Sequence, residues 1–153
     1  MKDMKKLSYF LLLFVSIFSV SFVACNDDDD KPILANELPQ AAKSFISQFY
    51  GDVKIAGVTR DSDNGKVEYD VIMANGHDLT FNAAGEWTDV DAPNGQTIPD
   101  GIAPVKISDY VKAQYSGFGI NEIAKEHYGY DVELTNGIDL EFNADGDFLR
   151  IDR

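Results

Sequence analysis

Residues 69–85 read YDVIMANGHDLTFNAAG, and residues 130–146 read YDVELTNGIDLEFNADG. The two stretches are 61 residues apart, and 11 of their 17 paired positions are identical. Self-similarity at a fixed spacing indicates a repeated supersecondary unit. The sequence therefore predicts two tandem copies of one unit, over residues 38–91 and 98–153, joined by a linker at residues 92–97.

Alternating apolar residues predict the strands of both copies. In the first copy they run from Val67 to Met73, and Leu79 and Phe81 follow the pair Asn75-Gly76. A period of two in aromatic and β-branched residues is typical of a strand with one buried face, and Asn-Gly favours a two-residue type I′ hairpin turn. Further strands are expected at Val53–Arg60, Trp87–Val90, Ile120–Lys125, Tyr128–Leu134, Ile138–Phe142 and Phe148–Ile151.

A helix is predicted before the strands of each copy. The first follows Leu38-Pro39, carries apolar residues at helical spacing and stops near Gly51. In the second copy Ile98-Pro99 opens the unit, and the helix is expected from Val105 to Tyr115. Proline fits the first helical position because its missing N–H would have no partner there. The predicted fold is α+β, with two tandem repeats of one helix plus about four antiparallel strands and the helices packed on one face of the sheet or sheets.

Residues 1–24 are predicted to be a targeting segment. Lysines near the start precede an apolar run from Leu7 to Ala24, which is the arrangement of a secretory signal peptide. Cys25 follows and is the only cysteine, so no intramolecular disulfide can form. Its place behind Phe22-Val23-Ala24 resembles the bacterial lipobox, in which the cysteine receives the lipid. An uncleaved membrane helix and an ordinary secreted protein are the alternatives, since the run is about long enough to span a bilayer.

Four adjacent aspartates, Asp27–Asp30, follow the cysteine. Adjacent carboxylates repel one another and resist burial, so residues 25–37 are expected to form a solvated acidic tether. An acidic run behind a lipidated cysteine also resembles the surface-export signal of some Gram-negative lipoproteins. The expected location is the outer membrane, as a lipoprotein that faces the cell surface or the periplasm.

The chain is strongly acidic, with 26 acidic and 13 basic side chains and a formal net charge of −13. Loss of residues 1–24 removes three lysines and one aspartate, which leaves −15 on about 129 residues. That length is enough for one compact domain with a core. The charge repels a phosphate backbone, which argues against nucleic acid as a partner, and it attracts basic proteins or cations.

The order of motifs resembles a known family. Leu-Pro, an amphipathic helix, Tyr-Asp-Val, Asn-Gly, Asp-Leu-x-Phe-Asn and x-Gly-x-Trp follow one another, and the second copy has Phe148 where the first has Trp87. The pattern is similar to the tandem PepSY-like, or putative β-lactamase-inhibitor-like, family of exported bacterial proteins over about residues 38–152. The resemblance implies a helix-plus-sheet fold and a noncatalytic binding or inhibitory module. It brings no catalytic residues, and some members have been labelled calcium-regulated periplasmic proteins.

Carboxylates gather on the predicted outer face of the hairpins. Alternation places there Asp70, Asp78, Asp131, Glu133, Asp139 and Glu141. One interpretation is a solvated sheet face, because acidic residues are mostly exposed. The other is a negative surface that docks a basic patch. The predicted function is a lipid-anchored, non-catalytic envelope module that docks a protein or peptide, with possible inhibition of that partner, and that meets the membrane through its lipid alone.

A divalent-cation site, for calcium binding or sensing, is the alternative prediction. Asn143, Asp145 and Asp147 offer oxygen ligands around Gly146, as calcium loops do. The full EF-hand spacing and its bidentate glutamate are missing. The first copy has Ala84 where the second has Asp145, so a plain hairpin turn is the competing interpretation. No other cofactor is expected.

No catalytic group is predicted. His77 and His127 are the only histidines, neither has a cysteine or second histidine at ligand spacing, and both are expected at the surface or partly buried. Serine-nucleophile contexts, phosphate-cradling glycine loops and zinc-protease helices are absent from the sequence. The sequence therefore predicts that the protein is not an enzyme.

Overall fold

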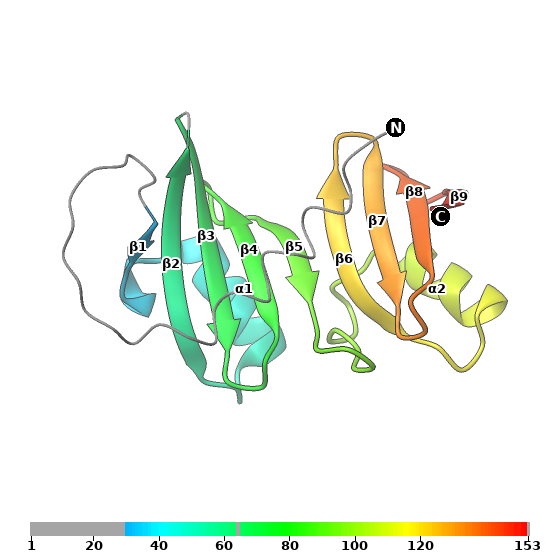
Figure 1. Ribbon diagram of the computed structural model, residues 1–153, viewed down its shortest axis with the longest axis horizontal. Helices are drawn as coiled ribbons and strands as arrows, with labels where there is room; N and C mark the ends of the chain where they lie inside the picture. The colour runs from blue at the N-terminus through cyan, green and yellow to red at the C-terminus, as the bar shows by residue number, and fades with distance from the viewer. Residues whose placement is uncertain (1–29, 64, 153) are drawn as a thin grey trace.

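The computed structural model describes residues 30–63 and 65–152 (Figure 1). Within them lie two α-helices and one nine-stranded antiparallel sheet, so the predicted α+β class is confirmed. The predicted signal peptide at residues 1–24, the predicted lipidation site Cys25 and the first part of the tether lie outside the described residues.

In each half of the chain one α-helix is followed by four strands. The first half contains β1 (Lys31–Pro32), a 3₁₀ turn η2 (Ala35–Glu37), α1 (Gln40–Tyr50), β2 (Ile55–Asp63), β3 (Lys66–Met73), β4 (Asp78–Asn82) and β5 (Trp87–Asp91). The second half contains α2 (Val105–Gln114), β6 (Ile120–Glu126), β7 (Gly129–Leu134), β8 (Asp139–Asn143) and β9 (Phe148–Asp152). The strands lie in the sheet in the order β1 to β9, so each one pairs with its neighbours in sequence (Figure 1).

Each helix begins directly after a proline. Pro39 is the N-cap of α1, and Pro104 is the N-cap of α2. The helix expected at Val105–Tyr115 is confirmed as α2, but the proline that precedes it is Pro104 and not Pro99. The residues after Pro99 form a loop in which Ile102 and Ala103 are buried, and only Pro104 stands next to a helical residue.

One face of the sheet carries the core. A row of apolar residues crosses eight strands, each residue the direct partner of the next: Val58, Val71, Leu79, Val90, Ile123, Val132, Leu140 and Ile151. All of them except Ile151 are buried. The row continues from β5 into β6, so the two halves share one sheet and one core.

Both helices pack on this core face through equivalent aromatic contacts. Phe45 of α1 meets Phe81 edge-on, with ring centroids 5.6 Å apart. Tyr110 of α2 meets Phe142 in the same way at 5.4 Å. Phe81 and Phe142 are fully buried and lie two positions from the apolar row, hence on its side of the sheet. The prediction that these two phenylalanines belong to the core is confirmed.

The seam between the halves is the short pairing of β5 with β6, which covers three residue pairs. The Lys125 ammonium lies over the Trp87 ring, 4.0 Å from its centroid. Asn121 is 3% exposed, and its side-chain amide donates to the carbonyl oxygens of Ala92, Pro93 and Gln96 at 2.9, 3.1 and 2.8 Å. The segment predicted as a linker is thus fastened to β6 by one side chain.

The hairpin loops hold three residues, not the two predicted from Asn-Gly. The Gly76 N–H donates to the carbonyl of Met73 at 2.9 Å, and the Met73 N–H donates to the carbonyl of His77 at 2.8 Å. Gly76 has φ +87°, which glycine adopts without strain. Loops of this length pair a turn with a left-handed glycine and a bulge. The same pattern closes the matching loop at Gly137.

Part of the predicted tether is ordered against the sheet. Lys31 and Pro32 pair with Arg60 and Thr59 of β2, and the Ile33 N–H donates to the carbonyl of Val58 at 3.1 Å. Residues 31–37 of the predicted tether thus form β1 and η2 beside β2, while most of their side chains stay exposed. The physical reason is that β2 leaves an open edge that a short extended segment can pair with.

Candidate functional site

The sheet face opposite the helices, which we call the acidic face, collects carboxylates in two rows (toward the viewer in Figure 1). The first row crosses six neighbouring strands without a break: Asp78, Asp91, Glu122, Glu133, Asp139 and Asp152, each the direct partner of the next. Directly opposed residues have Cβ atoms about 4.5–5.5 Å apart, and like charges so placed repel. The row therefore concentrates negative charge across most of the sheet.

The second row lies one pleat away on the same face. It runs through Asp70, Thr80, Asp89, Ala124, Asp131, Glu141 and Arg150. Arg150, on the outermost strand β9, is the one cation of these seven residues. The acidic face is thus negative across its middle and carries a positive side chain at the β9 edge.

The structure brings all six sequence-predicted partner-binding residues to this face. The first row holds Asp78, Glu133 and Asp139, and the second holds Asp70, Asp131 and Glu141. Sequence reasoning missed the carboxylates at the centre of the face, namely Asp89, Asp91 and Glu122. Their signal was present, because they alternate with the buried residues Val90 and Ile123.

The central carboxyl groups hold protons more tightly than usual. Burial, with the charges of Asp89, Asp91, Glu133 and Asp139, raises the pKa of Glu122 to about 8. Burial, together with neighbouring carboxylates led by Asp91, raises the pKa of Asp89 to about 7. Burial, and then Asp78 and Glu133, raises the pKa of Asp91 to about 6. A cation brought to this face would relieve the repulsion and displace these protons.

Three of the predicted residues are already engaged within the chain. Glu141 is 5% exposed and accepts a hydrogen bond of 2.6 Å from the Arg150 guanidinium. The Thr80 hydroxyl donates to Asp70 at 3.0 Å, and the Tyr128 hydroxyl donates to Asp131. These three side chains are therefore already committed to contacts within the chain.

Two of the predicted calcium ligands, Asn143 and Asp147, already bond to other groups of the chain. The Asn143 side-chain oxygen accepts from the N–H groups of Asp145 and Asp147 at 3.0 and 2.8 Å. Asp147 pairs with Lys106, with a nitrogen–oxygen distance of 2.5 Å. In the first half Asn82 accepts from Ala84 and Glu86 at 3.0 Å each. Both loops are thus built around one asparagine that bonds to backbone N–H groups.

Among residues 30–63 and 65–152, no group of three or more histidine, cysteine or carboxylate side chains is arranged to hold a metal ion.

The expectation that His77 lies at or near the surface is wrong. His77 is 4% exposed, and its Nδ1 lies 3.1 Å from the Tyr50 hydroxyl. Burial lowers the pKa of His77 and raises that of Tyr50. The pair ties the end of α1 to the β3–β4 loop, which is a packing role.

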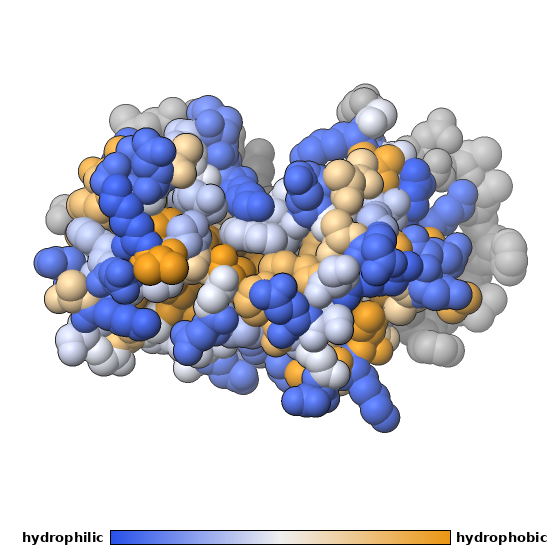
Figure 2. All heavy atoms as spheres, turned by 180° about the vertical axis from the view of Figure 1, so that it is seen from behind, coloured by the Kyte–Doolittle hydropathy of each residue, from blue (hydrophilic) through white to orange (hydrophobic). Residues whose placement is uncertain are grey.

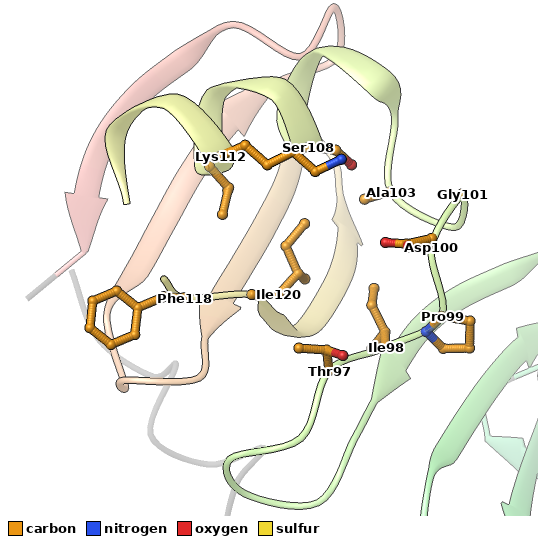
Figure 3. A pocket seen from close by; sticks show the side chains of 12 residues that line it. Thr97, Ile98, Pro99, Asp100, Gly101, Ala103, Ser108, Lys112, Phe118 and Ile120 are labelled. Carbon is orange, nitrogen blue, oxygen red and sulfur yellow. The ribbon is translucent and has the colours of Figure 1, made fainter. Parts of the chain in front are cut away.

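A small cavity lies between α2 and the loop that precedes it (Figure 3). Its volume is about 120 Å³, and its lining mixes apolar residues such as Ile98 and Val111 with polar ones such as Ser108. Figure 3 shows the Lys112 side chain running along α2 beside Ser108. Pockets for small molecules usually hold about 300–1,000 Å³, so this cavity is too small for most metabolites.

The helix side has a different character from the acidic face. Figure 2 shows mostly hydrophilic residues there, with apolar residues in the middle, where the two halves meet. No helix within the described ranges is long and apolar enough to cross a membrane.

Solved structures of bacterial proteins share this fold. A protein described as a putative periplasmic protein of the DUF2874 family, from Bacteroides vulgatus, is 34% identical, with a TM-score of 0.78, and the match covers 84% of this chain and 100% of that one. A protein described as a putative calcium-regulated periplasmic protein, from Bacteroides thetaiotaomicron, is 34% identical, with a TM-score of 0.77 and coverage of 82% and 98%.

A further structure from Bacteroides vulgatus, described as a putative periplasmic protein of unknown function, is 33% identical, with a TM-score of 0.77 and coverage of 81% and 99%. A search of curated proteins finds no match. The family model described as "Putative beta-lactamase-inhibitor-like, PepSY-like" matches residues 67–150. Matches of this extent settle the relationship, and the chain belongs to the PepSY-like, β-lactamase-inhibitor-like family.

Proposed function

We propose that the protein is a non-catalytic module of the bacterial envelope, anchored by a lipid on Cys25, that docks a basic protein or peptide on its acidic face. The observation that carries the proposal is the unbroken first row, in which six carboxylates stand directly opposite one another on six strands. Arranging like charges in this way costs stability. A cationic partner that pairs with them recovers that cost, and docking of this kind can inhibit the partner.

The architecture supports a docking body built from two copies of one unit. The register Tyr69↔Phe81 in β3 and β4 returns as Tyr130↔Phe142 in β7 and β8. The contact of Phe45 with Phe81 returns as that of Tyr110 with Phe142. Because the unit is duplicated, the acidic face is about twice as broad as that of one unit, and both halves place carboxylates on it. A broad face of this kind suits recognition of an extended basic surface.

The proposed location rests on the signal-like sequence of residues 1–25 and on the descriptions of the relatives. Three similar proteins are described as periplasmic, which fits an exported chain. The outer membrane, facing either the cell surface or the periplasm, is the proposed site of anchoring. Labelling with a fatty-acid analogue in cells should mark the wild-type chain and leave a Cys25→Ala variant unmarked. Equal labelling of the two chains would refute the anchor.

Two variants of equal charge test the docking face. The face variant carries Asp91→Asn, Glu122→Gln, Glu133→Gln and Asp139→Asn. The control variant carries Asp52→Asn, Asp100→Asn, Asp109→Asn and Asp145→Asn, all at exposed positions outside the two rows. Capture from envelope extracts at low and high salt should recover a basic partner with the wild type and the control, less at high salt, and lose it with the face variant.

The two variants separate specific docking from the effect of net charge. Equal recovery with both variants would count against the acidic face. Equal loss with both would show that net charge alone attracts the partner. Binding should also release protons, because a cation lowers the raised pKa values of Asp89 and Glu122, so affinity should be higher at pH 8 than at pH 5.5.

Calcium is the second candidate ligand. One relative is described as a putative calcium-regulated periplasmic protein, and Asp91 and Glu122 stand directly opposite each other. Isothermal titration and thermal melting of the wild type and the face variant with millimolar calcium test whether calcium binds. Heat and thermal stabilisation that the face variant loses would favour calcium, and no response would remove it.

A further inference from the structure

The outermost strand β9 occupies the same place in the second half that β5 occupies in the first. Leu79 pairs with Val90 in β5, and Leu140 pairs with Ile151 in β9. In the same way, Asp78 pairs with Asp91 and Asp139 pairs with Asp152. The two strands therefore present equivalent edges, 61 residues apart in the chain.

The two edges differ in what lies beside them. The edge of β5 is taken by β6, which pairs with it over Asp89, Val90 and Asp91, and Val90 is fully buried. Among the strands that the structure describes, β9 pairs with β8 alone, at the end of the sheet (Figure 1). Ile151 is 43% exposed and Leu149 is 49% exposed. An edge that carries exposed apolar side chains is a template for a further strand.

We propose that β9 pairs antiparallel with β9 of a second copy of this chain, about a two-fold axis at Ile151. In this register Ile151 faces Ile151 of the second copy, and Arg150 faces Asp152 of the second copy. Two-fold symmetry repeats that charge pair. The contact therefore has one pair of isoleucines at its centre and, on each side of it, one arginine that faces an aspartate. It spans three residue pairs, as the β5–β6 seam does.

The charges on β9 favour a second β9 as its partner, in the register that places Arg150 opposite Asp152. A shift of the axis to Arg150 would set two guanidinium groups opposite each other, which is unfavourable. The β2 edge of a second copy is the head-to-tail alternative, since β2 corresponds to β6. That edge is already paired with β1 through Lys31 and Pro32, and Thr59 would offer no charge to Arg150. Only the symmetric β9 pairing matches apolar with apolar and cation with anion.

The dimer places two acidic faces side by side in one sheet and is independent of whatever partner those faces bind. It also brings a cation to the end of the first row, where Asp139 and Asp152 stand opposite each other. The short contact predicts weak self-association, visible at high concentration or when chains are confined to a membrane surface.

A cysteine scan tests the register in the full chain carrying Cys25→Ser, so that no other thiol is present. Ile151→Cys places two sulfurs on directly opposed residues, within reach of a disulfide. Leu149→Cys is the control, because residue 149 and its symmetry mate would be separated by four residue steps, or about 13 Å. Mild oxidation should link the Ile151→Cys chains at least about tenfold faster than the Leu149→Cys chains.

Charge variants test the occupant by sedimentation velocity over a range of concentrations. Asp152→Arg should weaken self-association at least about tenfold, because it sets arginine against Arg150 of the second copy. A second variant carries Arg150→Asp together with Glu141→Gln. The change at Glu141 avoids repulsion between two carboxylates at positions 141 and 150 of the same chain. It should also be monomeric, and a mixture of the two variants should form heterodimers, because every charged pair then has opposite signs.

The outcomes decide the proposal. Self-association of the wild type, selective linkage through residue 151 and heterodimers in the mixture support it. A wild type that is monomeric at every concentration, with no selective linkage, overturns it. A dimer that links equally through residues 149 and 151, or that ignores the charge changes, places the interface elsewhere and overturns it as well.

Discussion

Asp91 at the end of β5 lies directly opposite Glu122 in β6, so the seam that joins the two halves sets one carboxylate against another. The charge of Asp91 is among the causes of the raised pKa of Glu122. A sheet that needed only to fold would be more stable with an opposite charge or a neutral residue at one of these positions. The charge at the seam therefore supports the docking surface that we propose.

The first prediction concerns pH. The folded pKa values of Asp89, Asp91 and Glu122, about 7, 6 and 8, lie above their ordinary values of 3.8, 3.8 and 4.5. Between these limits the folded protein binds more protons than the unfolded chain, so stability falls as pH rises. Thermal melting should show a protein more stable at pH 5 than at pH 9, by at least about 1 kcal/mol.

Variants assign this pH dependence to the acidic face. Glu122→Gln cannot titrate, so it should reduce the difference between pH 5 and pH 9. Asp100→Asn removes an exposed carboxylate that is not among the charges raising these pKa values, so it should leave the difference unchanged. Stability that rises from pH 5 to pH 9, in either the wild type or the Asp100→Asn chain, is incompatible with the raised pKa values.

The second prediction concerns the core. Phe81 is fully buried and receives the edge of Phe45, so Phe81→Ala should destabilise the protein by about 3–5 kcal/mol. Phe118 is 45% exposed, and Phe118→Ala should cost less than about 1 kcal/mol. Chemical denaturation measures both. A melting transition unchanged by Phe81→Ala would refute the core assignment.

The third prediction concerns the seam. The Asn121 amide donates to three linker carbonyls from a buried position. Asn121→Ala leaves those acceptors without their donor and should cost about 1–3 kcal/mol. Hydrogen exchange should speed up in residues 92–97 in particular. Asn94→Ala, at an exposed position of the same segment, is the control and should change neither quantity.

The fourth prediction concerns the turn proposed from sequence as a calcium loop. Asn143 organises this turn through two backbone N–H groups, and the first half makes the same turn with Ala84. Asp145→Ala should therefore change stability by less than about 0.5 kcal/mol, with or without calcium. Asn143→Ala should cost about 1 kcal/mol or more, because it leaves two N–H groups without their acceptor. A calcium-dependent stabilisation lost only in Asp145→Ala would restore the metal hypothesis.

Local periodicity predicted most of the strands. The alternation from Val67 to Met73 corresponds to β3 at Lys66–Met73, and the stretch Phe148–Ile151 corresponds to β9 at Phe148–Asp152. Apolar residues alternate along a strand because one side of the strand faces the core. The buried side can therefore be identified from the sequence of that strand alone. The outer positions of the six predicted carboxylates followed from the same rule.

Features that depend on distant contacts escaped the sequence. The burial of His77 depends on Tyr50, 27 residues away, and the role of Asn121 depends on a linker that precedes it by more than 20 residues. Asn-Gly indicated a turn but did not fix its length, because type I′ loops and three-residue loops both accept a left-handed glycine. Asp91 and Glu122 could be predicted to face each other only if the pairing of β5 with β6 were known. The alternation within either strand does not show which strand lies beside it.

Position-specific crosslinking in intact cells tests the docking face most directly. A photoreactive amino acid at Ala124 sits between Asp89 and Asp131 on the acidic face, and one at Ala113 sits at an exposed position of α2 on the opposite side. The account predicts a discrete adduct from position 124 that disappears in the background of the four face substitutions, and none from position 113. Adducts from position 113 alone, or an adduct at position 124 that survives those substitutions, would contradict it.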